Sequence, residues 1–450
     1  MKKFLPFLFL IVLSADAVKA QISVLTQHND NTRAGYNNKE KTLTTANVNA
    51  RQFGKVFSLA VDDQTYSQPL VMANLLINGG LHNVVIIATV NNSVYAYDAD
   101  NGTLYWQKNY TAVGQRPPKN TDMTGACGGS YQDFSGNMGI VGTPVIDSVS
   151  GTVYFVARST NNGASFVQHL HAVNLADGTE QQGSPVVITA SMPGNGDGSV
   201  NGTVSFDPQR NNQRQALTLV NGILYVSFSS HCDWRPYHGW IIGYDAKTLQ
   251  QKTVYNTTAN GYEAGLWQAG GGLAADAQGN LYVVTGNGSV GYNNDQTNPV
   301  NRGESALKLS PLGSTLSVAS YFTPFNYPAL EGADLDYGSM GAFLIPNSNY
   351  YFTGCKDGNL YLLNKDNMGA YNQEVNGVQQ NIYLNQGKTL RCQPSYLKSA
   401  SNEYVYVWSE NDALRAFPFN RITNKFDVGS QVVGPASGPQ GNSGAILATS

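Results

Sequence analysis

The side chains best suited to chemistry form one short run near the middle of the chain. These side chains can form ion pairs or hydrogen bonds with a ligand, or stack on it. They are His231, Asp233, Trp234, Arg235 and His238. We expect this run to be a ligand-contacting loop. The alternative is a rigid loop folded on its own aromatic side chains and held by Cys232, and we favour this alternative over catalysis. Two histidines without a third ligand make a poor zinc site.

Two further places carry candidate binding residues. Glu263 and Trp267 lie beside the glycines at 270–272. A tryptophan over a cavity suits a sugar or a flat ring, whereas the glycines alone predict only closely packed backbone. Asp334 and Asp336 alternate, so both point the same way in an extended chain and could bind calcium, although an Asx turn is the simpler interpretation. These carboxylates also leave open a carbohydrate-active enzyme that uses Glu263 or the Asp334 and Asp336 pair.

Other motif matches lack the context that they need. Residues 286–291 match G-x-G-x-x-G after a predicted strand, but no helical pattern follows. Residues 195–201 resemble the start of a calcium loop, but Phe206 occupies its acidic twelfth position. His169 and His171 share one side of a predicted strand. Because no third ligand is visible, we expect them to be polar fillers.

The elements that must position these residues recur along the chain. Each unit has two short runs of alternating apolar residues, with a further strand-like stretch before them and usually another after them. Four antiparallel strands repeated at this period predict the blades of an all-β propeller. The two central runs of the six units are residues 84–89 with 93–98, 152–157 with 169–174, 223–228 with 240–245, 280–285 with 305–310, 350–354 with 359–364, and 404–409 with 413–418.

The connections between the predicted strands are unequal. Turns between the first and second strands of a unit, and between the third and fourth, are short and share one face. The long connections all fall on the other face, which we call the long-loop face and expect to carry the binding site. They are residues 110–141, 190–215, 229–239, 256–270, 286–304, 323–340 and 372–393.

The two ends suggest a ring of more than six blades. Residues 54–61 form a lone apolar run, which in closed propellers completes the last blade and removes its free edge. Residues 445–449 look like the inner strand of a seventh blade. We therefore expect about seven or eight four-stranded blades, with the last blade incomplete in this chain. The alternative is six blades with a frayed tail.

The N-terminus predicts export. Two lysines precede an apolar run at residues 4–13, and small residues suit cleavage after Ala20. We expect residues 1–20 to be a signal peptide and residues 21–450 to form a single propeller domain, truncated at its C-terminus, in a secreted or periplasmic protein. No later segment is long and apolar enough to span a membrane.

Composition narrows the partners. Charged residues make up 13% of the chain and the net charge is −3, which argues against electrostatic binding of nucleic acid. The four cysteines suit an oxidising compartment. Pairing Cys127 with Cys232 and Cys355 with Cys392 would join neighbouring blades in both cases, although the other two pairings stay open.

One segment carries a family resemblance. Residues 96–106 read AYDADNGTLYW, which resembles the tryptophan-docking motif of quinoprotein-type propellers with an asparagine in place of threonine. Ala96, Asp98, Gly102 and Trp106 match the motif. Asp98 can bind turn amides, Gly102 permits a positive φ, and Trp106 can pack between blades. Further stretches that look like those of secreted bacterial PQQ-like β-propellers are residues 24–37, 231–240 and 271–288.

The resemblance implies a fold and two competing functions. Quinoprotein dehydrogenases hold PQQ over a tryptophan beside calcium, an aspartate and an arginine, often under two adjacent cysteines. This chain has no adjacent cysteines and no cluster of Lys and Arg for a tricarboxylate. We therefore expect a non-catalytic scaffold, without a cofactor, that binds a protein or carbohydrate ligand. The alternative is a dehydrogenase for alcohols or sugars that depends on PQQ and calcium.

Overall fold

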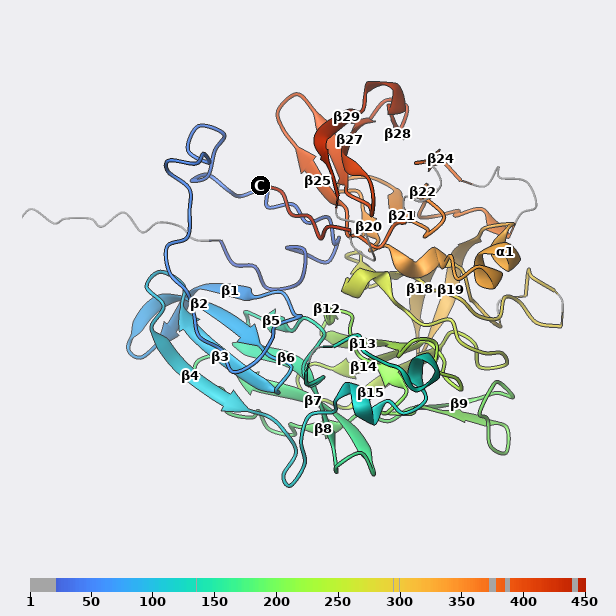
Figure 1. Ribbon diagram of the computed structural model, residues 1–450, viewed down its shortest axis with the longest axis horizontal. Coiled ribbons are helices and arrows are strands. Elements are labelled where there is room, and N and C mark those ends of the chain that lie inside the picture. The colour runs from blue at the N-terminus through green and yellow to red at the C-terminus, as the bar shows by residue number, and fades with distance from the viewer. Residues whose placement is uncertain are drawn as a thin grey trace, which may run out of the picture.

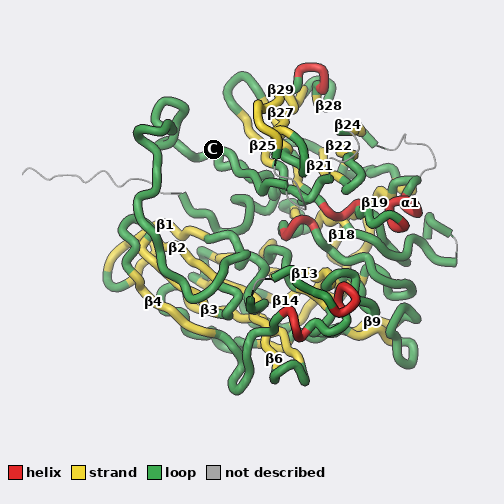
Figure 2. Tube along the Cα trace, in the orientation of Figure 1, coloured by secondary structure: helices red, strands yellow, loops and turns green. Residues whose placement is uncertain are grey.

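Six mainly antiparallel sheets of four or five strands surround a common centre in the computed structural model of the chain (Figure 1). The structure describes residues 22–134, 136–293, 295–298, 300–371, 378–384, 389–438 and 444–450, so the expected signal peptide lies outside the described residues. Loops make up much of the remaining chain (Figure 2). Among the described helices, none is long and apolar enough to cross a membrane.

The antiparallel strands of each sheet follow one another along the chain, as the repeated pattern predicted, and β23 joins the fourth sheet in parallel after β22 of the fifth. The six sheets are β1 (Leu70–Ile77), β2 (Gly80–Ala88), β3 (Ser93–Asp98) and β4 (Leu104–Asn109); β5 (Val145–Asp147), β6 (Thr152–Thr160), β7 (Phe166–Asn174) and β8 (Val186–Val187); β11 (Asn211–Asn212), β12 (Thr218–Val220), β13 (Ile223–Ser230), β14 (Trp240–Asp245) and β15 (Gln251–Asn256); β16 (Ala274–Ala275), β17 (Leu281–Val284), β18 (Ala306–Leu312), β19 (Thr315–Thr323) and β23 (Ala370–Tyr371); β20 (Phe343–Leu344), β21 (Tyr350–Gly354), β22 (Asn359–Asn364) and β24 (Gln380–Tyr383); β25 (Ser395–Lys398), β26 (Glu403–Val407), β27 (Ala413–Asn420), β28 (Lys425–Phe426) and β29 (Val432–Ser437).

Little regular structure lies outside these sheets. The other elements are the pair β9 (Ser191–Pro193) and β10 (Thr203–Ser205), helix α1 (Tyr327–Gly332), and 3-10 turns at Asn120–Asp122, Ala126–Gly129, Gln268–Gly270, Tyr337–Ser339 and Val428–Ser430.

The hydrophobic core lies between neighbouring sheets. Alternating side chains leave each strand on both faces, so each sheet can pack against the next on either side. Tyr154 of the second sheet, for example, shares a cluster with Phe228 and Trp240 of the third. The first strands of successive sheets also contact one another near the centre. This arrangement is that of a β-propeller.

The tryptophan-docking segment has the structural role that its residues suggested. Asp98 accepts hydrogen bonds from the backbone amides of Asp100 and Asn101, at 2.9 and 3.0 Å. The Trp106 Nε1–H donates to the Leu175 carbonyl oxygen of the second sheet, at 3.0 Å. A Cβ atom at Gly178 would lie only 2.8 Å from the Trp106 ring, so this glycine lets the ring pack against the next blade.

An N-terminal segment that sequence patterns did not predict crosses the centre of the ring. Residues 22–37, which we call the axial segment, exchange hydrogen bonds with one strand of each of the six sheets: β1, β5, β12, β16, β20 and β25. Seven bonds pair Val24 with Val71 (two bonds), Leu25 with Ile146, Asn31 with Leu219, Asn31 with Ala275, Thr32 with Leu344, and Ala34 with Tyr396. The buried Arg33 guanidinium donates five more, to Thr26, Gln27, Leu217, Thr218 and Leu273. The axial segment therefore ties the sheets together.

The predicted strand at residues 54–61 is wrong. This stretch has no strand pairing; instead, Leu59 and Val61 pack against Tyr95 and Tyr97 on the face of the first sheet. Its apolar residues cover a sheet face, which gives the same sequence pattern as an edge strand. The expected seventh inner strand at residues 445–449 is extended chain with isolated bridges, between Gln393 and Ile446 and between Tyr36 and Thr449.

Candidate functional site

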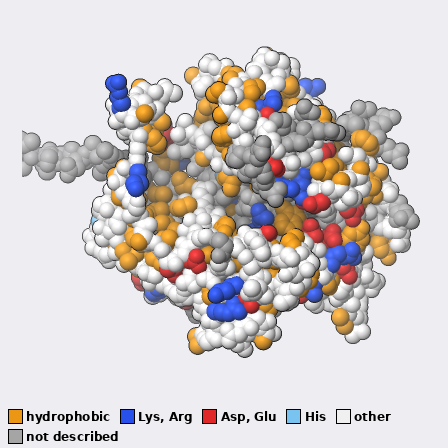
Figure 3. All heavy atoms as spheres, in the orientation of Figure 1, with side chains coloured by type: hydrophobic (Ala, Val, Ile, Leu, Met, Phe, Trp, Pro, Cys, Tyr) orange, Lys and Arg blue, Asp and Glu red, His pale blue; other side chains and the backbone are white. Residues whose placement is uncertain are grey.

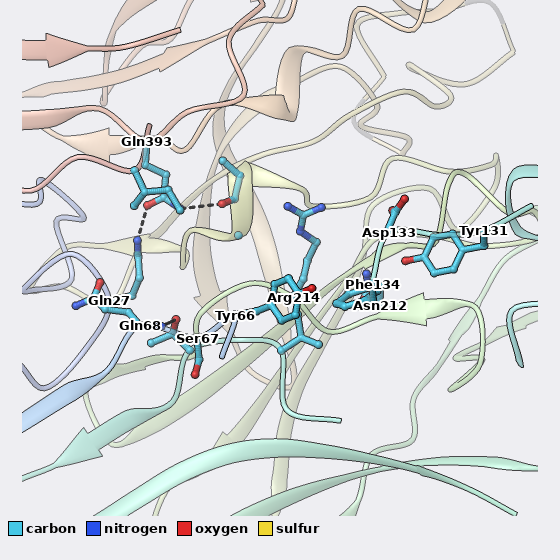
Figure 4. A pocket seen from close by; sticks show the side chains of 15 residues that line it. Gln27, Tyr66, Ser67, Gln68, Tyr131, Asp133, Phe134, Asn212, Arg214 and Gln393 are labelled. Carbon is cyan, nitrogen blue, oxygen red and sulfur yellow. Dashed lines mark hydrogen bonds between the residues drawn. The ribbon is translucent and has the colours of Figure 1, made fainter. Parts of the chain in front are cut away.

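A cavity of about 450 Å³ lies at the centre of the ring (Figure 4). Its wall comes from chain positions just before the first strands of several sheets, from the loop that enters the second sheet, and from the axial segment. The labelled lining side chains are Gln27, Tyr66, Ser67, Gln68, Tyr131, Asp133, Phe134, Asn212, Arg214 and Gln393. Because several sheets contribute, this axial cavity exists only once the sheets have assembled.

Arg214 is the one lysine or arginine among the described residues that line the axial cavity. In the described part of the chain its guanidinium has no hydrogen bond or ion pair, and its packing partner is the Trp267 ring, whose centroid lies 5.8 Å away. Burial lowers the pKa of Arg214, although Tyr131 and Asp133 oppose this effect. Figure 4 places it between Gln393 and Asp133. Sequence reasoning missed this residue because a lone arginine carries no motif.

A group of carboxylates that we call the carboxylate cluster, Asp233, Glu263, Glu304 and Asp336, lies beside this cavity wall. Burial, followed by the charge of Asp233, raises the pKa of Glu263 to about 7. Burial also raises the pKa of Asp233 to about 6, with Asp336 contributing. Glu304 is fully buried, and its pKa is raised well above the ordinary range by burial and by Asp336. The cluster therefore holds protons near neutral pH.

The cluster is only partly neutralised. The Lys356 Nζ donates to Asp336 Oδ2 at 2.7 Å and to Asp334 Oδ1 at 3.0 Å, so an ammonium group lies where the sequence suggested a metal ion. Among the described residues, no three His, Cys, Asp or Glu side chains are arranged to hold a metal. Buried oxygens in and beside the cluster that lack a hydrogen-bond partner among the described residues include Asn287 Oδ1, Glu304 Oε1 and Asp336 Oδ1.

Trp267 connects the axial cavity to the carboxylate cluster. Arg214 lies over its ring, and Gly286 separates its edge from Asp336. A Cβ atom at Gly286 would lie 2.8 Å from Trp267 Cδ1 and 3.6 Å from Asp336 Cγ. Gly286 thus lets the ring approach the carboxylate closely. The site has a positive group over one part of a flat ring and negative groups near another.

Arg235 lies at the solvent side of the cluster. Its Nε is 2.8 Å from Asp197 Oδ2 and 3.8 Å from Glu263 Oε1, and its guanidinium stacks 4.4 Å above the Tyr262 ring. The side chain is about half exposed. Figure 3 shows charged side chains gathered between the centre and the right edge of this face, in the region of α1 and β19. The expected long-loop face therefore presents both signs of charge.

Three candidates from the central run have structural partners instead. His231 is fully buried between Tyr131 and Arg158, at 2.8 and 2.9 Å. Both ring nitrogens of the buried His238 are bonded, to Thr258 Oγ1 and to the Asp197 carbonyl oxygen. Trp234 packs beneath Arg210 and against the hydrophobic loop that enters the second sheet. These residues fix the loop that carries Asp233 and Arg235.

One expected disulfide is present and the other is not. Cys127 and Cys232 are bonded, which joins the two loops that the sequence placed on one face. The predicted bond between Cys355 and Cys392 is wrong, because both thiols are free and buried. Cys355 belongs to the core between the fourth and fifth sheets, whereas Cys392 packs between the fifth and sixth.

Comparisons with known proteins bear on the fold alone. No family model and no curated protein matches the chain. Among solved structures, the quinohemoprotein alcohol dehydrogenase from Comamonas testosteroni superposes with a TM-score of 0.56 at 14% identity, over 95% of this chain and 68% of that one. Quinohemoprotein alcohol dehydrogenase ADHIIG from Pseudomonas putida HK5 gives 0.53 at 14% identity, over 90% and 59%. A europium-containing methanol dehydrogenase gives 0.52 at 11%, over 91% and 78%. The chain therefore has the PQQ-like β-propeller fold of these dehydrogenases.

Proposed function

We propose that this chain is an exported, non-catalytic binding propeller that captures a small anionic ligand with a flat ring in its axial cavity. The single observation that carries the proposal is the unpaired Arg214 guanidinium in the cavity wall, stacked over Trp267. Arg214 is partly buried, and a ligand carboxylate could supply two charge-assisted hydrogen bonds to its guanidinium. The disulfide between Cys127 and Cys232 supports a periplasmic or secreted location.

The neighbouring carboxylates support a ligand with limited negative charge. Asp336 lies near the edge of Trp267, across Gly286, and belongs to the carboxylate cluster with Asp233 and Glu263, so a polyanion would meet repulsion there. Polar or cationic substituents would suit this side of the site. An aromatic acid meets these requirements.

Binding of simple acids tests the proposal. Benzoate and phthalate, with uncharged benzamide as the matched control ligand, can be compared by saturation-transfer NMR and calorimetry. Arg214→Gln should weaken binding of the acids by about 10- to 100-fold, because a hydrogen bond to a charged group contributes ~1.5–3 kcal/mol. It should leave benzamide unaffected, and Arg51→Gln on the exposed N-terminal loop should change nothing. Equal binding of acids by the parent and Arg214→Gln would refute the proposal.

A second candidate, a dehydrogenase that uses PQQ with calcium, rests on a separate observation. The unpartnered buried oxygens of Asn287, Glu304 and Asp336 are the amide and carboxylate donors that calcium prefers. Trp267 and Arg214 could hold the quinone. The match is poor, because PQQ carries three carboxylates and Arg214 is the one cation of the cavity wall. Saturable binding of PQQ with calcium, together with dye reduction by an alcohol, would favour this candidate over the first.

A further inference from the structure

A second cavity is lined by residues of the outer strand β4 of the first sheet and of strand β7 of the second. Figure 1 shows where these two strands lie. The volume of this cavity is about 640 Å³, and it is open to solvent. Lys108, His169, His171 and Glu180 are the acidic and basic side chains among its described lining residues, which also include Tyr110. The proposed ligand site does not use any of them.

The Glu180 carboxylate fixes the tautomer of His171. The His171 Nδ1 lies 2.7 Å from Glu180 Oε1, and the Ser184 hydroxyl donates to the other carboxylate oxygen. Because an ionised carboxylate only accepts, Nδ1 carries the hydrogen and Nε2 keeps its lone pair. His171 is only 4% exposed, and its Nε2 has no hydrogen-bond partner. A histidine whose other nitrogen donates to a carboxylate is the usual form of a metal ligand.

His169 supplies a second imidazole on the same side of β7. The two ring centres are 6.0 Å apart, and the planes are inclined at 63°. With metal–nitrogen distances of ~2.0–2.1 Å, an ion bound by both rings needs ring centres roughly 5–6 Å apart. The half-buried His169 ring lines the same cavity as His171.

We propose that His169 and His171 bind a divalent transition-metal ion in this cavity, with water completing its coordination. Imidazole ligands favour copper, zinc and nickel over calcium and magnesium, and copper binds most tightly in this order. Glu180 acts as a positioning residue, because it orients the His171 ring and offsets the charge of the ion. Lys108, which also lines the cavity, opposes binding through its positive charge.

Copper titration of the untagged, exported protein at neutral pH tests this site. We expect calorimetry to detect one copper ion per chain and electron paramagnetic resonance to report directly bound imidazole nitrogens. His169→Ala should weaken binding at least tenfold. Glu180→Gln should weaken it by about 10- to 100-fold, as loss of such partners usually does. Lys108→Met should strengthen it. His171 itself stacks on Phe155 with centroids 5.0 Å apart, so its substitution could disturb the fold.

His82→Ala is the matched control. This histidine is partly exposed and lies beside Asp98, away from the cavity. Its loss should leave copper binding unchanged, and circular dichroism should show that every variant is folded. The site is refuted if the parent protein takes up no copper, if His169→Ala binds as well as the parent, or if only His82→Ala reduces binding. None of these outcomes depends on what occupies the axial cavity.

Discussion

Replacing Glu263 by glutamine measures the cost of holding a carboxylate inside the carboxylate cluster. Burial and then Asp233 raise the pKa of Glu263 to about 7 in the folded protein, from an ordinary value of 4.5. Between these two values the folded state binds more protons at this residue than the unfolded state does. The contribution of Glu263 to the free energy of unfolding is therefore fully present below pH 4.5. The protein loses stability as the pH rises from 4.5 towards 7.

The magnitude follows from the displacement of the pKa. At about 1.36 kcal/mol per pH unit, the shift corresponds to about 3 kcal/mol at neutral pH. The half-exposed Arg235, 3.8 Å from Glu263, stabilises the ionised carboxylate. Loss of this weak ion pair reduces the stability gained by the variant by at most about 1 kcal/mol. Glu263→Gln should thus raise the free energy of unfolding by about 2 kcal/mol at neutral pH and leave it unchanged near pH 4. With an unfolding entropy of about 0.9 kcal/mol per kelvin for a chain of this length, Tm should rise by about 2 °C.

Differential scanning calorimetry of the parent and the variant across pH 4 to 8 checks this expectation. Glu40→Gln is the control of opposite sign, because backbone amides of Leu43 and Thr42 lower the pKa of Glu40. That substitution should slightly destabilise the protein at neutral pH and have no effect in acid. If Glu263→Gln instead lowers Tm at neutral pH, Glu263 is an ionised ion-pair partner of Arg235, and the cluster does not hold protons.

Three further substitutions test the scaffold. Arg33→Met should cost about 3 to 5 kcal/mol in thermal unfolding, at about 1 kcal/mol for each of its five hydrogen bonds, whereas Arg51→Met on the surface should cost nothing measurable. Trp106→Ala should cost about 3 to 5 kcal/mol, measured by urea unfolding, because the ring fills the space between the first two sheets. Replacing Cys127 and Cys232 together by serine should cost about 2 to 5 kcal/mol in the same assay, since the bond closes a loop of 105 residues; an unchanged midpoint would mean that packing alone holds the two loops.

The repeated strands were predictable because each carries its own local signal. Alternating apolar residues bounded by Asn, Asp and Gly mark strands such as β13 and β22 without reference to the rest of the chain. The axial segment lacks such a signal. Its hydrogen bonds go to six sheets that are distant in sequence, and Arg33 reads as an ordinary surface arginine until those sheets close around it. The predicted strand at residues 54–61 was wrong for a related reason. An apolar run does not reveal whether its backbone pairs with a strand or its side chains cover the face of a sheet.

The candidate site was predictable where residues cluster in sequence and not where they converge in space. Asp233 and Arg235 were identified from their shared run, and Glu263 with Trp267 from theirs. Glu304 and Lys356 were missed, because one lies before β18 and the other after β21, and only folding brings both to Asp336. The burial of His231 could not be predicted from its run, because its partner Tyr131 lies a hundred residues away.

The polarity of the axial cavity belongs to the ring and not to any repeat. The chain positions that precede the first strands meet around the axis: the Gln68 amide donates to Thr143, Leu217 donates to the Thr143 carbonyl, and Gln393 donates to Ala269. A repeat protein with identical units would line this circle with identical side chains. Here the circle is mostly amides and hydroxyls, and Arg214 and Asp133 are its two charged side chains. A cation and a carboxylate at different points of this wall favour one orientation of an anionic ligand, which symmetric packing alone does not produce.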